Sequence, residues 1–223
     1  MLFDLRSRGR RRTVQVIYLG LAILIGGGLI LFGVGTGSGG GGLLNGLTGN
    51  GSNSGQTQAV SQATKAALKQ VKLNPSSPTA WSQLEQAYWT AAGNASTYDS
   101  TTGTYLYSAS GKKLLAKASS AWQHYLTLTK QPSADAAILA ARAYAHLGQY
   151  KQEANAWQYL IQSTPGSAKG YECLAFSAYA GKETRVADLA AQKALKLAPK
   201  LQQLQLQSAL KASKTQPLYA QEC

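Results

Sequence analysis

The sequence predicts an all-α protein in which an N-terminal transmembrane helix and a flexible glycine-rich linker precede a short α-solenoid of helical hairpins. From residue 57 to residue 214, apolar residues recur at intervals of three and four without sustained two-residue alternation. No Asp, Glu, Lys or Arg occurs in residues 13–64, which is hard to fit inside an ordinary soluble domain. Fourteen of the 23 glycines lie within residues 26–55. The chain therefore divides into parts of different kinds.

The N-terminal part indicates a membrane anchor. Residues 1–12 hold five arginines and one aspartate, so this tail carries +4 of the formal net charge of +13. The apolar run 13–35 follows, and a helix needs about 20 apolar residues to cross a hydrocarbon core of roughly 30 Å. Flanking arginines remain cytoplasmic. We therefore expect a single-pass protein of the cytoplasmic membrane, with a cytoplasmic N-terminus and an extracytoplasmic C-terminal domain.

Two export signals are alternatives to this anchor. A cleaved secretory signal would have an apolar region of about 7 to 15 residues and a small-residue cleavage site. The run here is longer, and no A-x-A site follows it. A twin-arginine signal would need particular residues after the arginine pair, which RRTVQV lacks. The pattern favours an uncleaved signal anchor.

Residues 36–56 are expected to form the linker. They consist of Gly, Ser, Thr and Asn with a few leucines, and cannot bury a core. About 20 such residues have a root-mean-square span of roughly 25 Å. The linker would keep the domain close to the membrane.

The second half of the chain repeats. Pro165 and Pro199 are 34 residues apart, and each closes a helix-like run. An interval of 34 is the period of the tetratricopeptide repeat (TPR). The repeat 134–167 has this motif's small, aromatic, glycine and proline residues at Ala141, Tyr144, Gly148, Tyr150, Trp157 and Pro165. The repeat 168–201 has motif residues at Tyr171, Leu174, Ala175, Ala187, Ala194 and Pro199.

On these residues the sequence resembles the TPR family, and in its organisation it resembles bacterial membrane-anchored TPR proteins. The resemblance implies helical hairpins in which small residues let the two helices touch. Glu153 departs from this pattern, because it stands where alanine is usual. Glu85 departs in the same way in an earlier, partial hairpin.

The earlier hairpin is interrupted. Its helices are expected at 78–89 and 111–129, with an insertion at about 93–110 that forms a loop or a small hairpin on one edge. A lone helix is expected at 59–75, and a capping helix at 201–213 covers the last apolar face. The helical domain thus spans 57–214, and residues 215–223 are a C-terminal tail.

Little in the sequence indicates chemistry. His124 and His146 fall on different predicted helices without a metal-ligating residue at i+3 or i+4. The acidic residues are scattered, so we expect no catalytic site, no metal, no cofactor and no small-molecule substrate. We also expect no nucleic acid partner outside the membrane. Cys173 and Cys223 can form a disulfide outside the cytoplasm, but their spacing does not require one.

Binding is the remaining class of function. The resemblance implies a groove lined by the first helix of each hairpin, with seven candidate partner-binding residues: Gln86, Trp89, Arg142, His146, Lys169, Phe176 and Tyr179. Aromatic residues and arginine are the types that anchor peptides. The alternative is that the three aromatic residues among them pack against adjoining helices. The carboxylate clamp of chaperone-binding members is not expected, because it needs asparagine where Gln86, Arg142 and Phe176 stand.

These features together predict a membrane-anchored extracytoplasmic scaffold that binds protein or peptide partners. A more specific form of this hypothesis is an accessory to secretion or envelope assembly. The alternative is a basic structural module bound to cell-wall polymer or anionic lipid, because the part after residue 64 carries +9. Lysines at helical spacing, however, more often mark a solvated face.

Overall fold

A computed structural model describes residues 53–101 and 103–223. The predicted cytoplasmic tail and transmembrane helix, and most of the predicted linker, lie outside these residues. Within them, no helix combines the length and the apolar character needed to cross a membrane. The chain divides into two units, Met1–Val60 and Ser61–Cys223. The packing described below is that of the second unit.

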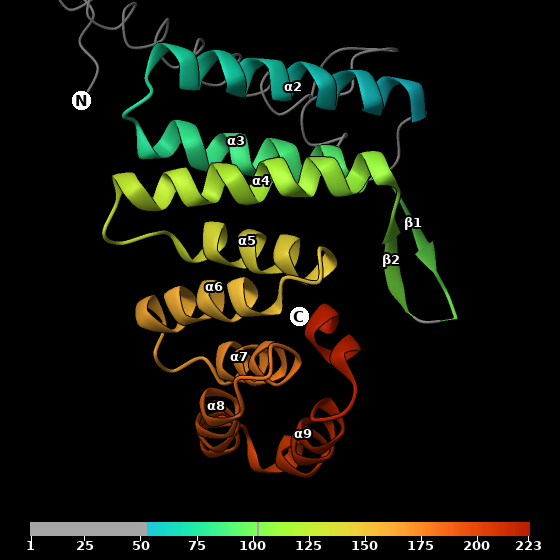
Figure 1. Ribbon diagram of the computed structural model, residues 1–223, viewed down its shortest axis with the longest axis vertical. Coiled ribbons are helices and arrows are strands. Elements are labelled where there is room, and N and C mark those ends of the chain that lie inside the picture. The colour runs from blue at the N-terminus through green and yellow to red at the C-terminus, as the bar shows by residue number, and fades with distance from the viewer. Residues whose placement is uncertain (1–52, 102) are drawn as a thin grey trace, which may run out of the picture. The chain divides into compact units, whose positions relative to one another are not determined.

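The described residues are mostly helical, and the predicted all-α class is confirmed (Figure 1). Helices α3 and α4, α5 and α6, and α7 and α8 pack as consecutive hairpins. Helix α2 begins four residues before the predicted start of the domain at residue 57. The helices are α2 (Asn53–Leu73), α3 (Pro78–Gly93), α4 (Ala109–Leu128), α5 (Ala134–His146), α6 (Tyr150–Ser163), α7 (Ala168–Ala180), α8 (Thr184–Leu197), α9 (Lys200–Ser213) and the 3₁₀ helix η1 (Pro217–Glu222).

The insertion between α3 and α4 forms a small hairpin, as predicted. Strands β1 (Ser96–Asp99) and β2 (Thr104–Tyr107) pair antiparallel, with Ser96 opposite Tyr107. Each strand has only four residues, with the two outer ones half-buried and the two inner ones exposed, so neither strand shows the two-residue alternation by which a sheet is predicted from sequence. Figure 1 shows the hairpin projecting at one end of α3 and α4.

The backbone repeats with the 34-residue period of the sequence. After α5, the N–H of Gln149 donates a hydrogen bond to the carbonyl of Tyr144 at 2.9 Å, and after α7, the N–H of Glu183 donates to the carbonyl of Ala178 at 2.8 Å. The helix starts repeat in the same way, because serine side chains cap both α5 and α7. The two hairpins are therefore built by the same local hydrogen bonds.

Small residues occupy the close contacts between helices, as the pattern predicts. The side chains of Ala141, Ala175 and Ala187 have no exposed surface. Larger side chains fill the space around these contacts: Trp122 and Trp157 are 2% and 3% exposed. Alanine thus lets the helices approach, while the aromatic side chains bury most of the apolar area.

The turn after α7 contains a strained residue. Gly148 ends the turn after α5 with φ +70°, and Lys182 occupies the equivalent position 34 residues later with φ 62°. A residue with a side chain is disfavoured in this left-handed conformation by about 1 kcal/mol or more. Glycine adopts it without that cost.

We predict that Lys182→Gly raises the free energy of unfolding by about 0.5 to 1 kcal/mol, measured by chemical denaturation. Gly148→Ala is the matched control, because a Cβ there would meet nothing within 4 Å and only the backbone is strained. Gly148→Ala should lower stability by a similar amount. Loss of stability in Lys182→Gly would contradict this explanation.

Candidate functional site

The chain turns back after α9, so that η1 packs on α7 and also contacts α5 and α9 (Figure 1). We call residues 217–223 the C-terminal segment. The surface beneath it, formed by Arg142 of α5 with Cys173 and Phe176 of α7, is called the docking face. Two of the seven residues predicted to bind a partner, Arg142 and Phe176, belong to this face.

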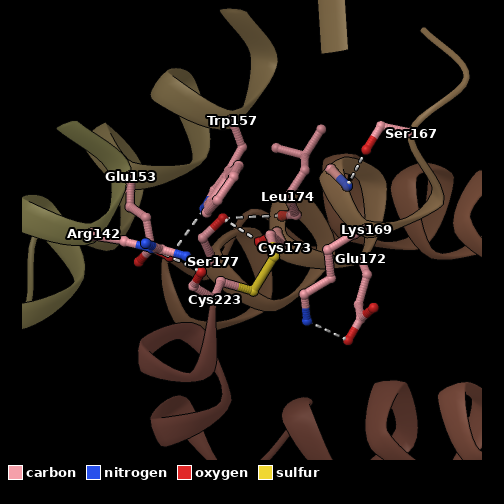
Figure 2. The surroundings of a disulfide bond; sticks show 11 residues. Arg142, Glu153, Trp157, Ser167, Lys169, Glu172, Cys173, Leu174, Ser177 and Cys223 are labelled. Atoms are coloured by element: carbon pink, nitrogen blue, oxygen red, sulfur yellow. Dashed lines mark hydrogen bonds and ion pairs between the residues drawn. A yellow bond between two sulfur atoms is a disulfide. The ribbon is translucent and has the colours of Figure 1, made fainter. Parts of the chain in front are cut away.

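Three different interactions hold the C-terminal segment on the docking face. Cys223 forms a disulfide with Cys173. The Nε of Arg142 donates a hydrogen bond to the carbonyl oxygen of Cys223 at 3.0 Å (Figure 2). The rings of Phe176 and Tyr219 lie with their centroids 5.4 Å apart. The disulfide that the sequence left open is therefore present in the structure.

The position of Phe176 in the repeat implies an exposed side chain, but this side chain is buried. It is only 2% exposed, and Tyr219 lies against its ring. The expectation of an exposed groove residue is wrong here, and the packing alternative holds. The packing partner includes the C-terminal segment, whose position no helical pattern predicts.

Tyr179 lies at the other end of α7 and is half-buried. Its hydroxyl hydrogen-bonds to the carboxylate of Asp188. The ammonium group of Lys214 lies 5.1 Å from the centroid of its ring and also contacts Asp188. Tyr179 thus contacts Asp188 of α8 and Lys214, and Lys214 leads into the C-terminal segment.

Trp89 and His146 form a separate cluster with the insertion. The ring of Tyr107 from β2 lies 4.7 Å from that of His146, whose ring lies 6.3 Å from that of Trp89. Burial and the charge of Arg142 both lower the pKa of His146. The imidazole is therefore neutral at neutral pH, and the β-hairpin covers this part of the predicted groove.

The remaining two candidates are exposed and belong to neither of these two clusters. Lys169 forms an ion pair with Glu172 at 3.0 Å in the first turn of α7. Gln86 is exposed on α3, and its backbone carbonyl accepts a hydrogen bond from Thr90. The structure thus brings some of the seven residues to the C-terminal segment, brings others to the insertion, and leaves Lys169 and Gln86 on the surface.

Tyr219 and Cys223 are functional candidates that the sequence does not single out as binding residues, although it leaves open a disulfide between Cys223 and Cys173. Both fell in the predicted tail 215–223, and the pairing partner of Cys223 is 50 residues away. The only signals in the sequence were a cysteine and an aromatic residue in a segment otherwise interpreted as a tail.

A second feature is a cleft of about 320 Å³ beside α4 and α6. Its polar lining consists mainly of carboxamide side chains, and the hydroxyl of Tyr144 accepts a hydrogen bond from Gln123 at 3.2 Å. No charged residue lines it. The lining residues are Trp122, Gln123, Leu126, Tyr144, Gln152, Asn155, Ala156, Gln158, Tyr159 and Gln162.

Two carboxyl groups are buried inside the hairpins. Glu85 and Glu153 have no exposed surface. Trp157 donates a hydrogen bond to Oε1 of Glu153 at 3.2 Å, while Oε2 of Glu153 and both oxygens of Glu85 have no hydrogen-bond partner. Burial raises the pKa of each carboxyl from 4.5 to about 9. Both groups are therefore protonated at neutral pH, and neither is accessible to a substrate.

These are the same two glutamates that depart from the repeat pattern, at positions where a small residue is usual. They lie in different hairpins, on α3 and α6. In the described part of the chain, no three or more His, Cys, Asp or Glu side chains are grouped so that they could hold a metal ion.

No protein-family model matches the chain, and a comparison with curated proteins gives no match.

We predict that the free energy of unfolding falls as pH rises, because Glu85 and Glu153 hold protons in the folded state and release them on unfolding. Stability from this source is fully present below pH 4.5, the ordinary pKa, and is lost as pH rises through about 9. Between these two pH values, each carboxyl lowers the free energy of unfolding by up to about 1.4 kcal/mol for each unit by which the pH rises. The thermal unfolding midpoint should therefore decrease between pH 5 and pH 9.

Glu85→Gln and Glu153→Gln keep the size of the side chain but remove its titration, so each should flatten the pH dependence and raise stability at pH 8. Glu222→Gln, on an exposed carboxyl, is the control and should leave the slope unchanged. An identical slope in the wild type and the two buried variants would contradict the assignment.

Proposed function

We propose that this protein is a membrane-anchored TPR protein whose extracytoplasmic domain binds segments of other proteins. One observation carries the binding role: the docking face already holds a peptide segment, residues 217–223, through a disulfide, a hydrogen bond and a ring contact. A surface that accepts one short segment has the shape and the groups needed to accept another. The role is that of a scaffold and not of an enzyme.

The family assignment is supported by the agreement between sequence period and backbone. The turn hydrogen bonds, the serine caps and the buried alanines recur at the spacing on which the resemblance to TPR proteins rests. Repeat proteins of this kind bury their apolar faces by stacking and offer extended surfaces for partners. The fold is therefore well suited to binding protein partners.

The membrane part of the proposal rests on the sequence of residues 1–56. Five arginines before an apolar run of spanning length place the following domain outside the cytoplasm. An uncharged linker then limits how far the domain can travel from the membrane. A scaffold held there is suited to meet exported chains as they emerge, which fits an accessory role in secretion or envelope assembly.

The proposal is tested by crosslinking in native membranes treated with dithiothreitol, because the disulfide-bonded C-terminal segment covers the docking face, followed by identification of the captured proteins. Arg142→Ala should reduce capture about tenfold, the effect of losing an interface contact worth about 1.4 kcal/mol. Arg185→Ala is the matched control, because Arg185 is an exposed arginine on α8 away from the docking face. Capture that is equal in the wild type and in Arg142→Ala would contradict binding at this face.

The alternative function, attachment to cell-wall polymer or anionic lipid, is favoured by two observations. The part of the chain after residue 64 carries +9, and the uncharged cleft lined by carboxamides and aromatic rings has groups that can hydrogen-bond and stack with a polymer. Electrostatic attachment is screened by salt. Attachment that is abolished by raising salt, and that weakens equally in Arg142→Ala and Arg185→Ala, would favour this alternative.

A further inference from the structure

We infer that the C-terminal segment is an intramolecular ligand: it occupies a site for a partner peptide with an aromatic residue followed by a small one, and the Cys173–Cys223 disulfide keeps that site closed. This inference rests on the proposed function, and it adds both the kind of partner and the condition under which the partner binds.

The contacts of the segment define the chemistry of the partner. Tyr219 places an aromatic ring against Phe176, and the next residue, Ala220, is 1% exposed and leaves no room for a larger side chain. Arg142 binds the main-chain oxygen of Cys223, so this contact places no demand on a side chain of the partner. A peptide from another protein therefore needs an aromatic residue followed by a small one to make the same contacts.

Other positions of the segment place few demands on a partner. Leu218 is 54% exposed, and Pro217 and Glu222 are also exposed. Their side chains are therefore free to vary in a competing peptide. The specificity of the docking face is concentrated in two adjacent residues.

The segment is separable from the helical hairpins. It follows the end of α9 at Ser213 through the exposed residues 214–216, and it forms only the short helix η1. Helix α7 packs against α6 and α8 independently of it. Release of the segment would therefore uncover Phe176 and free the guanidinium of the exposed Arg142, while leaving the hairpins assembled.

The disulfide determines whether a partner can compete. A segment joined by a short connection reaches its site at a millimolar effective concentration, and a covalent bond adds to this advantage. The apparent affinity of a partner is reduced in proportion to the fraction of sites that are open. A closed disulfide therefore excludes the partner, and an open one allows exchange between the segment and the partner.

A dithiol reductant is the co-reactant that opens the disulfide. Cys223 is partly exposed whereas Cys173 is fully buried, so one thiolate of the dithiol attacks Cys223 Sγ. A mixed disulfide forms, and the Cys173 sulfur leaves and takes up a proton. The second thiol of the dithiol then releases Cys223 as a thiol. The dithiol loses two electrons and two protons and becomes a disulfide.

The test measures binding of a fluorescent synthetic peptide with the sequence of residues 214–223, with serine at the position of Cys223, to the purified full chain by fluorescence anisotropy. The oxidised chain should bind the peptide weakly. After dithiothreitol treatment, or in Cys223→Ser, the peptide should bind about tenfold more tightly or better, because the open fraction rises. A peptide with alanine at the position of Tyr219 should lose this binding.

Tyr219→Ala in the reduced chain should bind the unmodified peptide more tightly than the reduced wild type, because its own segment competes less for Phe176, whereas the control Arg185→Ala should leave the affinity unchanged. Circular dichroism of each form verifies that the hairpins are retained, and the reduced wild type provides the test should Cys223→Ser fail to fold. Equal affinity for the oxidised chain and for every reduced form would overturn the inference. If the peptide binds no form while Arg142-dependent capture in membranes persists, the inference fails and the proposed function stands. If that capture is also absent, both fail.

Discussion

Close contact between the two helices of each hairpin is the constraint on which the rest of the structure depends. Ala141, Ala175 and Ala187 are fully buried where helices approach one another, and a larger side chain at such positions would force the helices apart or strain its own conformation. The positions of α5 and α7 follow from these contacts. Arg142, Cys173 and Phe176 are then fixed in one arrangement, so the docking face is a consequence of how closely the hairpins pack.

Helix α7 has the central position in this arrangement. It packs against α6 and α8, and both α9 and η1 also contact it. Five consecutive residues after Cys173, from Leu174 to Ala178, are buried, which is more than a one-sided amphipathic helix requires. An α-helix that is apolar on nearly every side needs a partner on every side. In this chain the C-terminal segment provides the last of these partners.

The two buried glutamates show how the same constraint accommodates an exception. Glu85 and Glu153 occupy contact positions that usually hold small residues, and their carboxyls remain protonated because burial disfavours the charged form. A neutral carboxyl needs no ion pair, but an oxygen without a hydrogen-bond partner still costs stability. The protein is therefore more tolerant of acid than of alkali at these two sites.

Much of the helical architecture could be predicted from the sequence, because a 34-residue period and buried small residues are local signals that repeat. The turn at Lys182 could not, since a lysine gives no sign that its backbone is left-handed. The place of the C-terminal segment was also beyond prediction. It depends on a long-range contact between Cys223 and Cys173, and a seven-residue segment carries no periodic pattern. For the same reason Phe176 was expected to be exposed.

The candidate site was predicted in part. Arg142 and Phe176 were selected as anchoring types, and both contact the C-terminal segment. Trp89 is a candidate on the same grounds and His146 through its groove position in the repeat, but both contact Tyr107 of the insertion. The pattern locates first-helix positions that face away from the hairpin partner, but it contains no information on which other segments cover them.

Amide hydrogen exchange of the full chain, compared between the oxidised and the dithiol-reduced forms, tests most directly the claim that the C-terminal segment is a separable cover on a stack of hairpins that is stable by itself. We predict that the amides of Tyr219, Ala220 and Cys223 are protected in the oxidised chain and exchange faster after reduction. The amides of α5 to α8 should keep their protection. Protection of the segment that is unchanged by reduction, or loss of protection throughout α7 and α8, would contradict it.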